Sequence, residues 1–429
     1  MAIKRYIGKE INVKAQSLNP SPLGFICSLT IAYKDILKAK EALADVTRKT
    51  PLDFSATFST LAGSKIYLKL ENLQKTGSFK VRGAYNKLAN LKNDEKRRVI
   101  AASAGNHAQG VAFAASKLGI LCTIVMPEMA SPAKIAAVSS YGAKIVLAGS
   151  TFDESLPKAI EIAKETSATM IHPFDDPHVI AGQGTVGLEL LEDLDKIGAV
   201  VAPVGGGGLI SGLALAIKEK RPNVKIVGVQ AAAAPSMVTS VQNGKMTAVS
   251  MERTIADGIA VKKPGELTYK IVSEHVDNLV TVDDNEIAEA VYLLLERGKI
   301  VVEPAGAAAL AALLHHKTEL EGKKVAVIVS GGNIDMPLLG QLIQRGLGRT
   351  GRIVRMVIEL FDRPGALKDL LNIIASKNAN VLDVQQDRLG PKIGLGKVDV
   401  LLSFEIARRD QIKEITKELS NLGYEYRML

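Results

Sequence analysis

Short apolar runs alternate with amphipathic, often Ala-rich stretches over most of the chain. The runs are rich in β-branched residues, which favour strands, and the stretches between them, such as 106–118 and 132–141, favour helices. The strands that we predict here are 65–70, 98–102, 122–126, 144–147, 199–203, 225–230 and 325–329. This alternation favours an α/β fold with a parallel sheet between layers of helices, where ligands bind at the carboxyl ends of the strands.

The C-terminal part follows a different pattern. Its apolar positions predict strands at 353–360, 381–388, 397–405 and 424–428, and helices at 364–377 and 409–422. The resulting βαββαβ order is that of the ferredoxin-like motif, which can fold as its own unit at roughly 75 residues. The segment 344–352 holds three glycines among arginines and predicts a linker. We therefore expect an N-terminal extension (1–28), a catalytic domain (29–345) and a regulatory domain (350–429).

The composition narrows the classes of function. A chain of 429 residues is long enough for two or three domains, and hydrophobic residues at 47% supply a large core. The net charge of +9 is spread along the chain, which favours a field that attracts anionic ligands over nucleic-acid binding. The apolar stretch 20–33 is too short to span a bilayer. Two cysteines and six scattered histidines favour a reducing cytoplasm and no metal site.

The first motif with chemical content is Gly77–Ala84, GSFKVRGA, in which glycines flank Lys80 beside an aromatic residue. A lysine at a helix start is commonly just a solvated charge. In a partly apolar site, however, the amine loses its proton readily and attacks a carbonyl to form a Schiff base.

The second motif is Ser103–Gly110, SAGNHAQG, between a predicted strand and a predicted helix. Free amides at the start of a helix favour an anion such as a substrate carboxylate. Asn106 offers a neutral donor for an oxygen on a cofactor ring. The alternative is a helix N-cap at Ser103 followed by small residues for close packing. For the His107 side chain itself we favour a packing role.

The third motif is Gly205–Gly212, GGGGLISG, again between a strand and a helix. Four glycines in succession cost about 0.5–1 kcal/mol each to order relative to Ala, so a flexible linker is the alternative. The flanking strand and helix favour a phosphate cradle of inward-facing backbone amides. The run matches neither the nucleotide-binding P-loop nor the dinucleotide fingerprint, since Gln230 stands where an acid is expected.

The fourth motif, Ser330–Asp335, reads SGGNID and follows the strand 325–329. A hydroxyl at a strand end can bond a ring nitrogen, although a plain turn explains the motif equally well. Taken together, the four motifs supply an amine, a ring-oxygen donor, a phosphate cradle and a ring-nitrogen partner. That set predicts a pocket for pyridoxal 5'-phosphate.

These motifs, in this order, resemble the threonine dehydratase family, whose two-lobed fold is shared with tryptophan synthase β subunits. The resemblance covers about residues 29–429. It implies that Lys80 forms the Schiff base with the cofactor, that Asn106 binds its phenolic oxygen and that Ser330 faces its pyridine nitrogen. The positions that it implies for the phosphate are Gly205, Gly206, Gly207, Gly208 and Leu209. Those implied for the substrate are Ser103, Ala104, Gly105 and His107.

The resemblance also implies that Glu303 lies near the cofactor ring and that Gly258 lines the pocket. The C-terminal part resembles an ACT domain, in which the turn Asp362–Leu367 helps to bind an amino-acid effector. Pro364 in this turn suits the first position of a helix. A domain that only drives oligomerisation is the alternative, and we expect a homo-oligomer.

Two departures from the family pattern limit the chemistry. Relatives that bind a divalent cation carry acids at the position of Gln230 and near Ser236, and both acids are missing here. Serine racemases of the family carry a serine where this chain has Ala104, so an acid for the opposite face of the substrate is missing. This favours elimination over racemisation.

The resemblance therefore predicts deamination of L-threonine to 2-oxobutanoate and ammonia, in isoleucine biosynthesis or threonine catabolism, with Lys80 as the base that takes the α-proton. L-Serine dehydratase and serine racemase are the nearest alternatives. An amino-acid-sensing binding protein is the alternative from another class.

Overall fold

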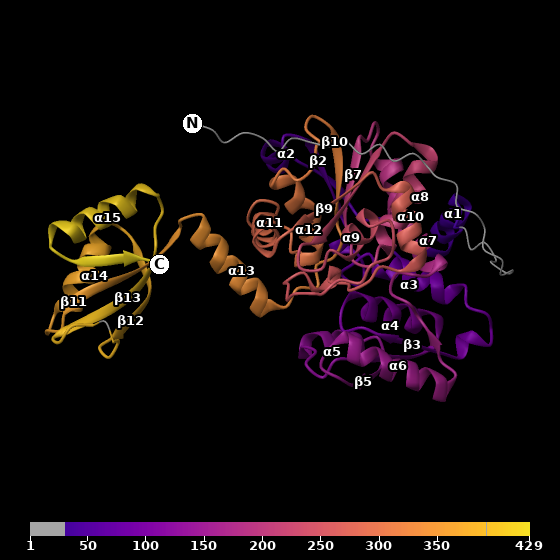
Figure 1. Cartoon of the computed structure of the whole chain (residues 1–429), viewed down its shortest axis with the longest axis horizontal. Helices are drawn as coiled ribbons and strands as arrows, with labels where there is room; N and C mark the ends of the chain where they lie inside the picture. The colour runs from indigo at the N-terminus through magenta and orange to yellow at the C-terminus, as the bar shows by residue number, and fades with distance from the viewer. Residues whose placement is uncertain (1–30, 392) are drawn as a thin grey trace. The chain divides into compact units, whose positions relative to one another are not determined.

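The computed structural model describes residues 31–391 and 393–429. The extension predicted for residues 1–28, with Cys27, lies outside this range. Figure 1 shows the chain with its helices and strands labelled. In the part that is described, no helix combines the length and the apolar character needed to cross a membrane.

A six-stranded sheet forms the centre of the large lobe, in the order β1-β2-β10-β7-β8-β9. All neighbouring strands are parallel except β1, which pairs antiparallel with β2. The strands are β1 (Leu52–Ser55), β2 (Lys65–Leu70), β7 (Ala199–Pro203), β8 (Lys225–Ala231), β9 (Asn278–Val282) and β10 (Lys324–Val329). Because β7 and most of β10 are buried on both sides, they form near-continuous apolar runs that do not alternate, and β10 has a lysine only at its first position, Lys324.

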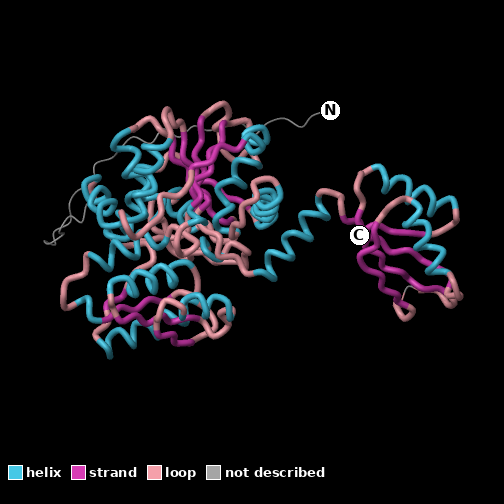
Figure 2. The backbone as a smooth tube through the Cα atoms, turned by 180° about the vertical axis from the view of Figure 1, so that it is seen from behind, coloured by secondary structure: helices cyan, strands magenta, loops and turns pink. Residues whose placement is uncertain are grey.

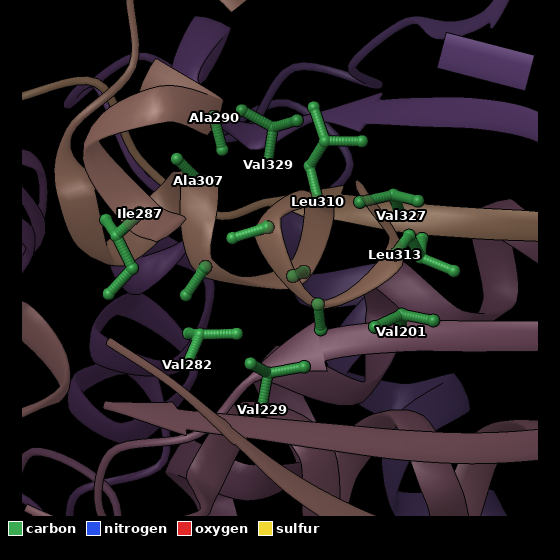
Figure 3. Close-up of a cluster of buried hydrophobic side chains, with 14 of the residues drawn as sticks. Val201, Val229, Val282, Ile287, Ala290, Ala307, Leu310, Leu313, Val327 and Val329 are labelled. Atoms are coloured by element: carbon green, nitrogen blue, oxygen red, sulfur yellow. The ribbon is translucent and has the colours of Figure 1, made fainter. Parts of the chain in front are cut away.

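Helices cover both faces of this sheet. On one face, α11 (Asp284–Glu296) and α12 (Pro304–Leu314) pack on valines of β7, β8 and β10 (Figure 3). The alanines of α12 let its backbone lie close to the strands. The other face is covered by α7 (Pro177–Asp193), α8 (Gly208–Lys220) and α10 (Glu266–His275). The remaining elements of this lobe are α1 (Tyr33–Leu43), α2 (Ala56–Ala62), η1 (Glu71–Leu73), α9 (Ser236–Gln242) and η3 (Asp257–Ile259). The helix α3 (Lys80–Ala89) packs on both lobes, since it contacts α7 and its Ala84 and Leu88 belong to the core of the small lobe. The short helix η2 (Glu95–Arg97) leads directly into the small lobe.

The small lobe is built on a four-stranded, fully parallel sheet in the order β5-β4-β3-β6. Its strands are β3 (Arg98–Ala102), β4 (Leu121–Met126), β5 (Lys144–Leu147) and β6 (Thr169–Met170). Its helices are α4 (Asn106–Leu118), α5 (Pro132–Ser139) and α6 (Phe152–Thr166). The predicted α/β fold with two lobes and parallel sheets is confirmed.

The C-terminal unit has the predicted βαββαβ order, with an antiparallel sheet β12-β13-β11-β14. Figure 2 shows its two helices on one side of the strands. The elements are β11 (Ile353–Phe361), α14 (Ala366–Ser376), β12 (Asn380–Asp387), β13 (Lys397–Glu405), α15 (Asp410–Asn421) and β14 (Glu425–Met428). One detail is wrong: Gly365 caps α14 with φ of +88°, so Pro364 precedes the helix and does not take its first position.

The segment predicted as a linker, 344–352, is mostly helical, because the helix α13 (Met336–Arg349) runs through it to Arg349. A Cβ added to Gly346 would lie 2.1 Å from the ring of Tyr292 on α11, so glycine serves close helix packing here and not flexibility. Arg349 pairs with Glu289 of α11 at 3.1 Å. The domain bounds 29–345 and 350–429 stay predictions.

Candidate active site

Lys80 is the first residue of α3, at the carboxyl edge of the large sheet. Its Nζ donates a hydrogen bond of 2.9 Å to the carbonyl oxygen of Pro173. The loss of surrounding water lowers the pKa of Lys80 to about 8, against a weaker opposing effect of Glu303. A lysine with this pKa is neutral in a substantial fraction of molecules near neutral pH, which is what a nucleophile or base requires.

The loop before Lys80 interlocks with the Ser330–Asp335 loop. Phe79 N–H donates to the Ser330 carbonyl at 3.1 Å, and Gly332 N–H donates to the Gly77 carbonyl at 2.9 Å. The side chain of Asn333 donates to the carbonyl of Thr76 at 2.9 Å. Ser330 itself is buried at the end of β10. The first and fourth motifs therefore form one structural unit.

Asn106 opens α4 at the carboxyl end of β3. The N-cap is Gly105 and not Ser103, whose hydroxyl accepts instead from Gly105 N–H at 3.2 Å. Ser103, Ala104, Gly105 and Asn106 are all partly exposed. A Cβ added to Gly105 would meet no atom within 4 Å, so open space adjoins the first turn of α4. The first turn of a helix leaves amides without intrahelical partners, and an anion site at this end would use them.

His107 differs from its neighbours because it is buried. Its Nε2 lies 2.9 Å from the carbonyl oxygen of Ile171, and burial lowers its pKa to about 3. The ring is therefore neutral and bonds the backbone through Nε2. This contact agrees with the packing role, and it lends no support to substrate binding through that nitrogen.

Glu303 caps the start of α12 and lies beside Asn106, whose Nδ2 donates to its Oε1 at 2.6 Å. Burial raises the pKa of Glu303 to about 7, although the hydrogen bond from Asn106 acts in the opposite direction. The carboxyl group therefore exchanges a proton near neutral pH. Gly258, on η3, lies close by, since a Cβ added to it would be 2.9 Å from Ala305 of α12.

The glycine run connects β7 to α8, which begins at Gly208. Among the described residues, the N–H groups of Gly205, Gly206, Gly207 and Gly208 donate to no other group. They are followed by the buried Leu209. Thr268 of α10 holds the loop from outside through a bond of 2.6 Å to the Gly206 carbonyl.

Sequence reasoning missed the segment His172–Asp176, which joins two of the motifs. Pro173 accepts from Lys80, and a Cβ added to Gly206 would lie 2.3 Å from the ring of Phe174. Asp175 caps α10 by accepting from Leu267 N–H at 3.0 Å. Asp176 and Pro177 signal a helix start in the sequence, but no local pattern tells that Phe174 packs on a distant glycine loop.

Gln230, which stands where some relatives carry an acid, has a different use. Its Oε1 accepts from Met237 N–H at 2.8 Å and from Val238 N–H at 2.9 Å, so it caps α9. Within residues 31–391 and 393–429, no group of three or more His, Cys, Asp and Glu side chains is arranged to hold a metal ion.

The residues fit pyridoxal phosphate. The four amides of the glycine loop that donate to no other group among the described residues suit its phosphate. Glycine is required in this loop because a Cβ added to Gly206 or Gly208 would collide with Phe174. Lys80 follows the loop that is bonded to the Ser330–Asp335 loop, and Asn106 joins this unit through Asn333, whose Nδ2 donates to Asn106 Oδ1 at 2.6 Å. The amine, the amide donor and the hydroxyl match the cofactor's aldehyde, phenolic oxygen and ring nitrogen.

Comparison with known proteins agrees with this geometry. The model of the pyridoxal-phosphate dependent enzyme family matches residues 43–331, and that of the ACT domain matches residues 354–423. The chain belongs to the pyridoxal-phosphate dependent enzymes. The L-threonine ammonia-lyase of Thermotoga maritima is 49% identical to it over 400 residues, or 93% of this chain and 100% of that protein.

Two solved structures of the family are also similar. The threonine deaminase of T.th. is 44% identical with a TM-score of 0.67, over 71% of this chain and 99% of its own. Maize serine racemase is 36% identical with a TM-score of 0.70, over 75% of this chain and 99% of its own. The predicted family, fold and cofactor are confirmed, while the roles of individual residues stay predictions.

Proposed function

We propose that this enzyme deaminates L-threonine to 2-oxobutanoate and ammonia by β-elimination. The observation that carries the proposal is the Lys80 amine, whose pKa is lowered to about 8 and whose loop is hydrogen-bonded to the Ser330–Asp335 loop. The names of its relatives, L-threonine ammonia-lyase and threonine deaminase, support the choice of substrate.

Each residue of the site has its own proposed role in this reaction. When bound, pyridoxal phosphate supplies an electron-withdrawing ring that makes the α-proton of the substrate acidic. Gly205 to Gly208 would hold its phosphate, Asn106 its phenolic oxygen and Ser330 its ring nitrogen. Lys80 acts as the base that takes the α-proton, since its amine is neutral in a large share of molecules near pH 8.

The segment Ser103–Gly105 would bind the substrate carboxylate at the first turn of α4, next to the open space beside Gly105. Ala104 has no group that holds a proton on the opposite face of the substrate. Its methyl group therefore favours elimination over racemisation, which argues against the serine racemase alternative.

The ACT domain supports a regulatory role, and we propose that it binds an amino-acid effector in a homo-oligomer of this cytoplasmic enzyme. Inhibition by isoleucine would place the enzyme in isoleucine biosynthesis, and its absence would favour threonine catabolism.

The decisive experiment replaces Lys80 with Ala. We expect loss of the visible absorbance of the bound cofactor and loss of 2-oxobutanoate formation from L-threonine. The matched control is Lys92→Ala, because Lys92 is exposed and lies outside the site. Activity retained by Lys80→Ala would refute the assignment.

The substrate is tested separately with L-threonine, L-serine and D-serine on the wild-type enzyme. We expect the highest kcat/KM with L-threonine. Higher turnover of L-serine, or racemisation of either serine, would favour one of the alternatives.

A further inference from the structure

Asn333 lies in the SGGNID motif but has no role in the proposed mechanism. Its Nδ2 donates two hydrogen bonds, one of 2.9 Å to the carbonyl oxygen of Thr76 and one of 2.6 Å to Oδ1 of Asn106. It therefore touches both the loop that carries Lys80 and the amide expected to bind the cofactor ring.

The contact with Thr76 fixes the orientation of the Asn333 amide. A backbone carbonyl only accepts hydrogen bonds, so the NH₂ group of Asn333 must face it. The backbone is close on the other side as well, since a Cβ added to Gly77 would lie 2.3 Å from Oδ1 of Asn333. The second hydrogen of the same NH₂ group is thus directed at Asn106.

This orientation determines that of Asn106 in turn. Because the Asn333 NH₂ group is a donor, the atom of Asn106 that faces it is the acceptor Oδ1. The NH₂ group of Asn106 then points to Oε1 of Glu303, at 2.6 Å. An amide turned by 180° would place two donors against each other on one side. The chain of bonds from Thr76 to Glu303 therefore leaves one favourable orientation.

We propose that Asn333 is a positioning residue that fixes the orientation of the Asn106 amide, so that one N–H of its NH₂ group donates to Glu303 and the other is left for the cofactor. The inference rests on the proposed role of Asn106. A phenolic oxygen needs a donor, and the opposite orientation would present a carbonyl oxygen that repels it. Asn333 does not touch the reacting atoms; it selects which end of Asn106 meets them.

The test uses Asn333→Asp and Asn333→Ala in the full-length protein. Aspartate keeps the shape but removes both donors, and its charge attracts the NH₂ group of Asn106 and so turns that amide around. We expect Asn333→Asp to weaken pyridoxal phosphate binding by about 10- to 100-fold, the range for a hydrogen bond to a charged group, and Asn333→Ala to weaken it less. Binding is measured by titrating the cofactor-free protein and following the visible absorbance.

A double-mutant cycle separates positioning from folding. In an Asn106→Ala background there is no amide to turn, so Asn333→Asp should weaken cofactor binding no further. The Tm of the cofactor-free protein should change no more than in the matched control Asn93→Asp, which places the same charge at an exposed site. If Asn333→Asp does not fold, the same cycle with Asn333→Ala decides.

Equal losses for Asn333→Asp and Asn333→Ala, or a loss that persists without the Asn106 amide, would overturn the proposal. Either result leaves the proposed function intact, because the wild-type protein still takes up the cofactor. Failure of the wild-type protein to bind pyridoxal phosphate would overturn both.

Discussion

Two polar clusters each hold a buried carboxyl group, and the charge state of that group differs between them. The first, here the charge cluster, consists of Lys69, Glu71, Arg82 and Glu189. The second, here the amide cluster, consists of Asn106, Glu303 and Asn333. Glu71 and Glu303 are both almost fully buried, but only Glu71 has cations for partners.

In the charge cluster, the Arg82 guanidinium contacts both oxygens of Glu71 at 2.8 Å and Oε1 of Glu189 at 2.6 Å. Lys69 pairs with Oε2 of Glu189 at 2.6 Å. Two cations thus face two anions. Burial alone would raise the pKa of Glu71, but Arg82, the hydrogen bond from Thr50 and the charge of Lys69 together hold that pKa below its ordinary value.

In the amide cluster, Glu303 has a neutral amide as its hydrogen-bond partner, and its pKa rises to about 7. An amide donor only partly replaces lost water, so the carboxylate stays unfavourable. Burial therefore does not set the charge state of a carboxyl group by itself. A buried carboxyl group paired with cations, such as Glu71, stays charged and can stabilise the fold. A buried carboxyl group with a neutral partner, such as Glu303, exchanges its proton near neutral pH.

The largest expected effect comes from breaking the charge cluster with Arg82→Met. This leaves two buried carboxylates without their main partner, and we expect a loss of about 3–5 kcal/mol in the free energy of unfolding. Urea unfolding of the cofactor-free protein measures it, with Arg97→Met at an exposed site as control. A loss no larger than that of the control would mean that the cluster does not hold the fold together.

The second prediction concerns Glu303 and pH. Its pKa is raised from 4.5 to about 7, so the folded protein binds this proton more tightly than the unfolded chain does. The proton on Glu303 contributes on the order of 3 kcal/mol to the free energy of unfolding. This contribution is complete below pH 4.5 and is lost as the pH rises through 7. Glu303→Gln removes this dependence.

The measurement is the Tm of both proteins between about pH 5 and pH 8, which brackets the titration, with the exposed Glu219→Gln as control. Wild type should lose stability relative to Glu303→Gln as pH rises. A difference that stays constant with pH would show that Glu303 titrates normally.

The third prediction concerns the pKa of Lys80. Its pKa of about 8 should appear as the midpoint of labelling of the cofactor-free protein by acetic anhydride, read by mass spectrometry of the Lys80 peptide. Because the charge of Glu303 raises this pKa, Glu303→Gln should move the midpoint to lower pH. A midpoint near 10.5 in the wild type would contradict the assigned environment.

The smallest effect is expected outside the lobes, at the exposed pair of Arg388 and Asp362, whose Nε and Oδ2 lie 2.9 Å apart. Water and salt screen such a pair, so Asp362→Asn should leave the Tm of the protein nearly unchanged. A loss of stability comparable with that of Arg82→Met would show that this exposed pair stabilises the fold as much as the buried pairs do.

Local patterns predicted much of the fold. The strands Lys65–Leu70 and Ala199–Pro203 and the helix Asn106–Leu118 have the predicted bounds, since their residues report burial and helix capping directly. The glycines of 344–352 did not indicate the helix that runs to Arg349, because a glycine that allows close packing on Tyr292 looks the same in sequence as one in a loop.

The motifs likewise predicted which segments meet at the site, because strand ends converge at one edge of a parallel sheet. They did not predict what joins these segments. The bond from Lys80 to Pro173, and that from Asn333 to Asn106, connect residues 93 and 227 positions apart. Such pairings depend on the assembled lobes and leave no local pattern.

The ties between α3 and α7 have a consequence for the small lobe. The chain leaves α3, builds that lobe and returns in α7, and Asn86 Nδ2 joins the two helices again through a bond of 2.7 Å to the carbonyl of His178. In topological terms the small lobe is an insertion with adjacent ends. Ala84 and Leu88 of α3 belong to the same apolar core as Val99 of β3 and Val111 of α4, so this core reaches across the junction between the insertion and the rest of the chain. The helix that begins with Lys80 and the helix that begins with Asn106 are therefore packed into one core.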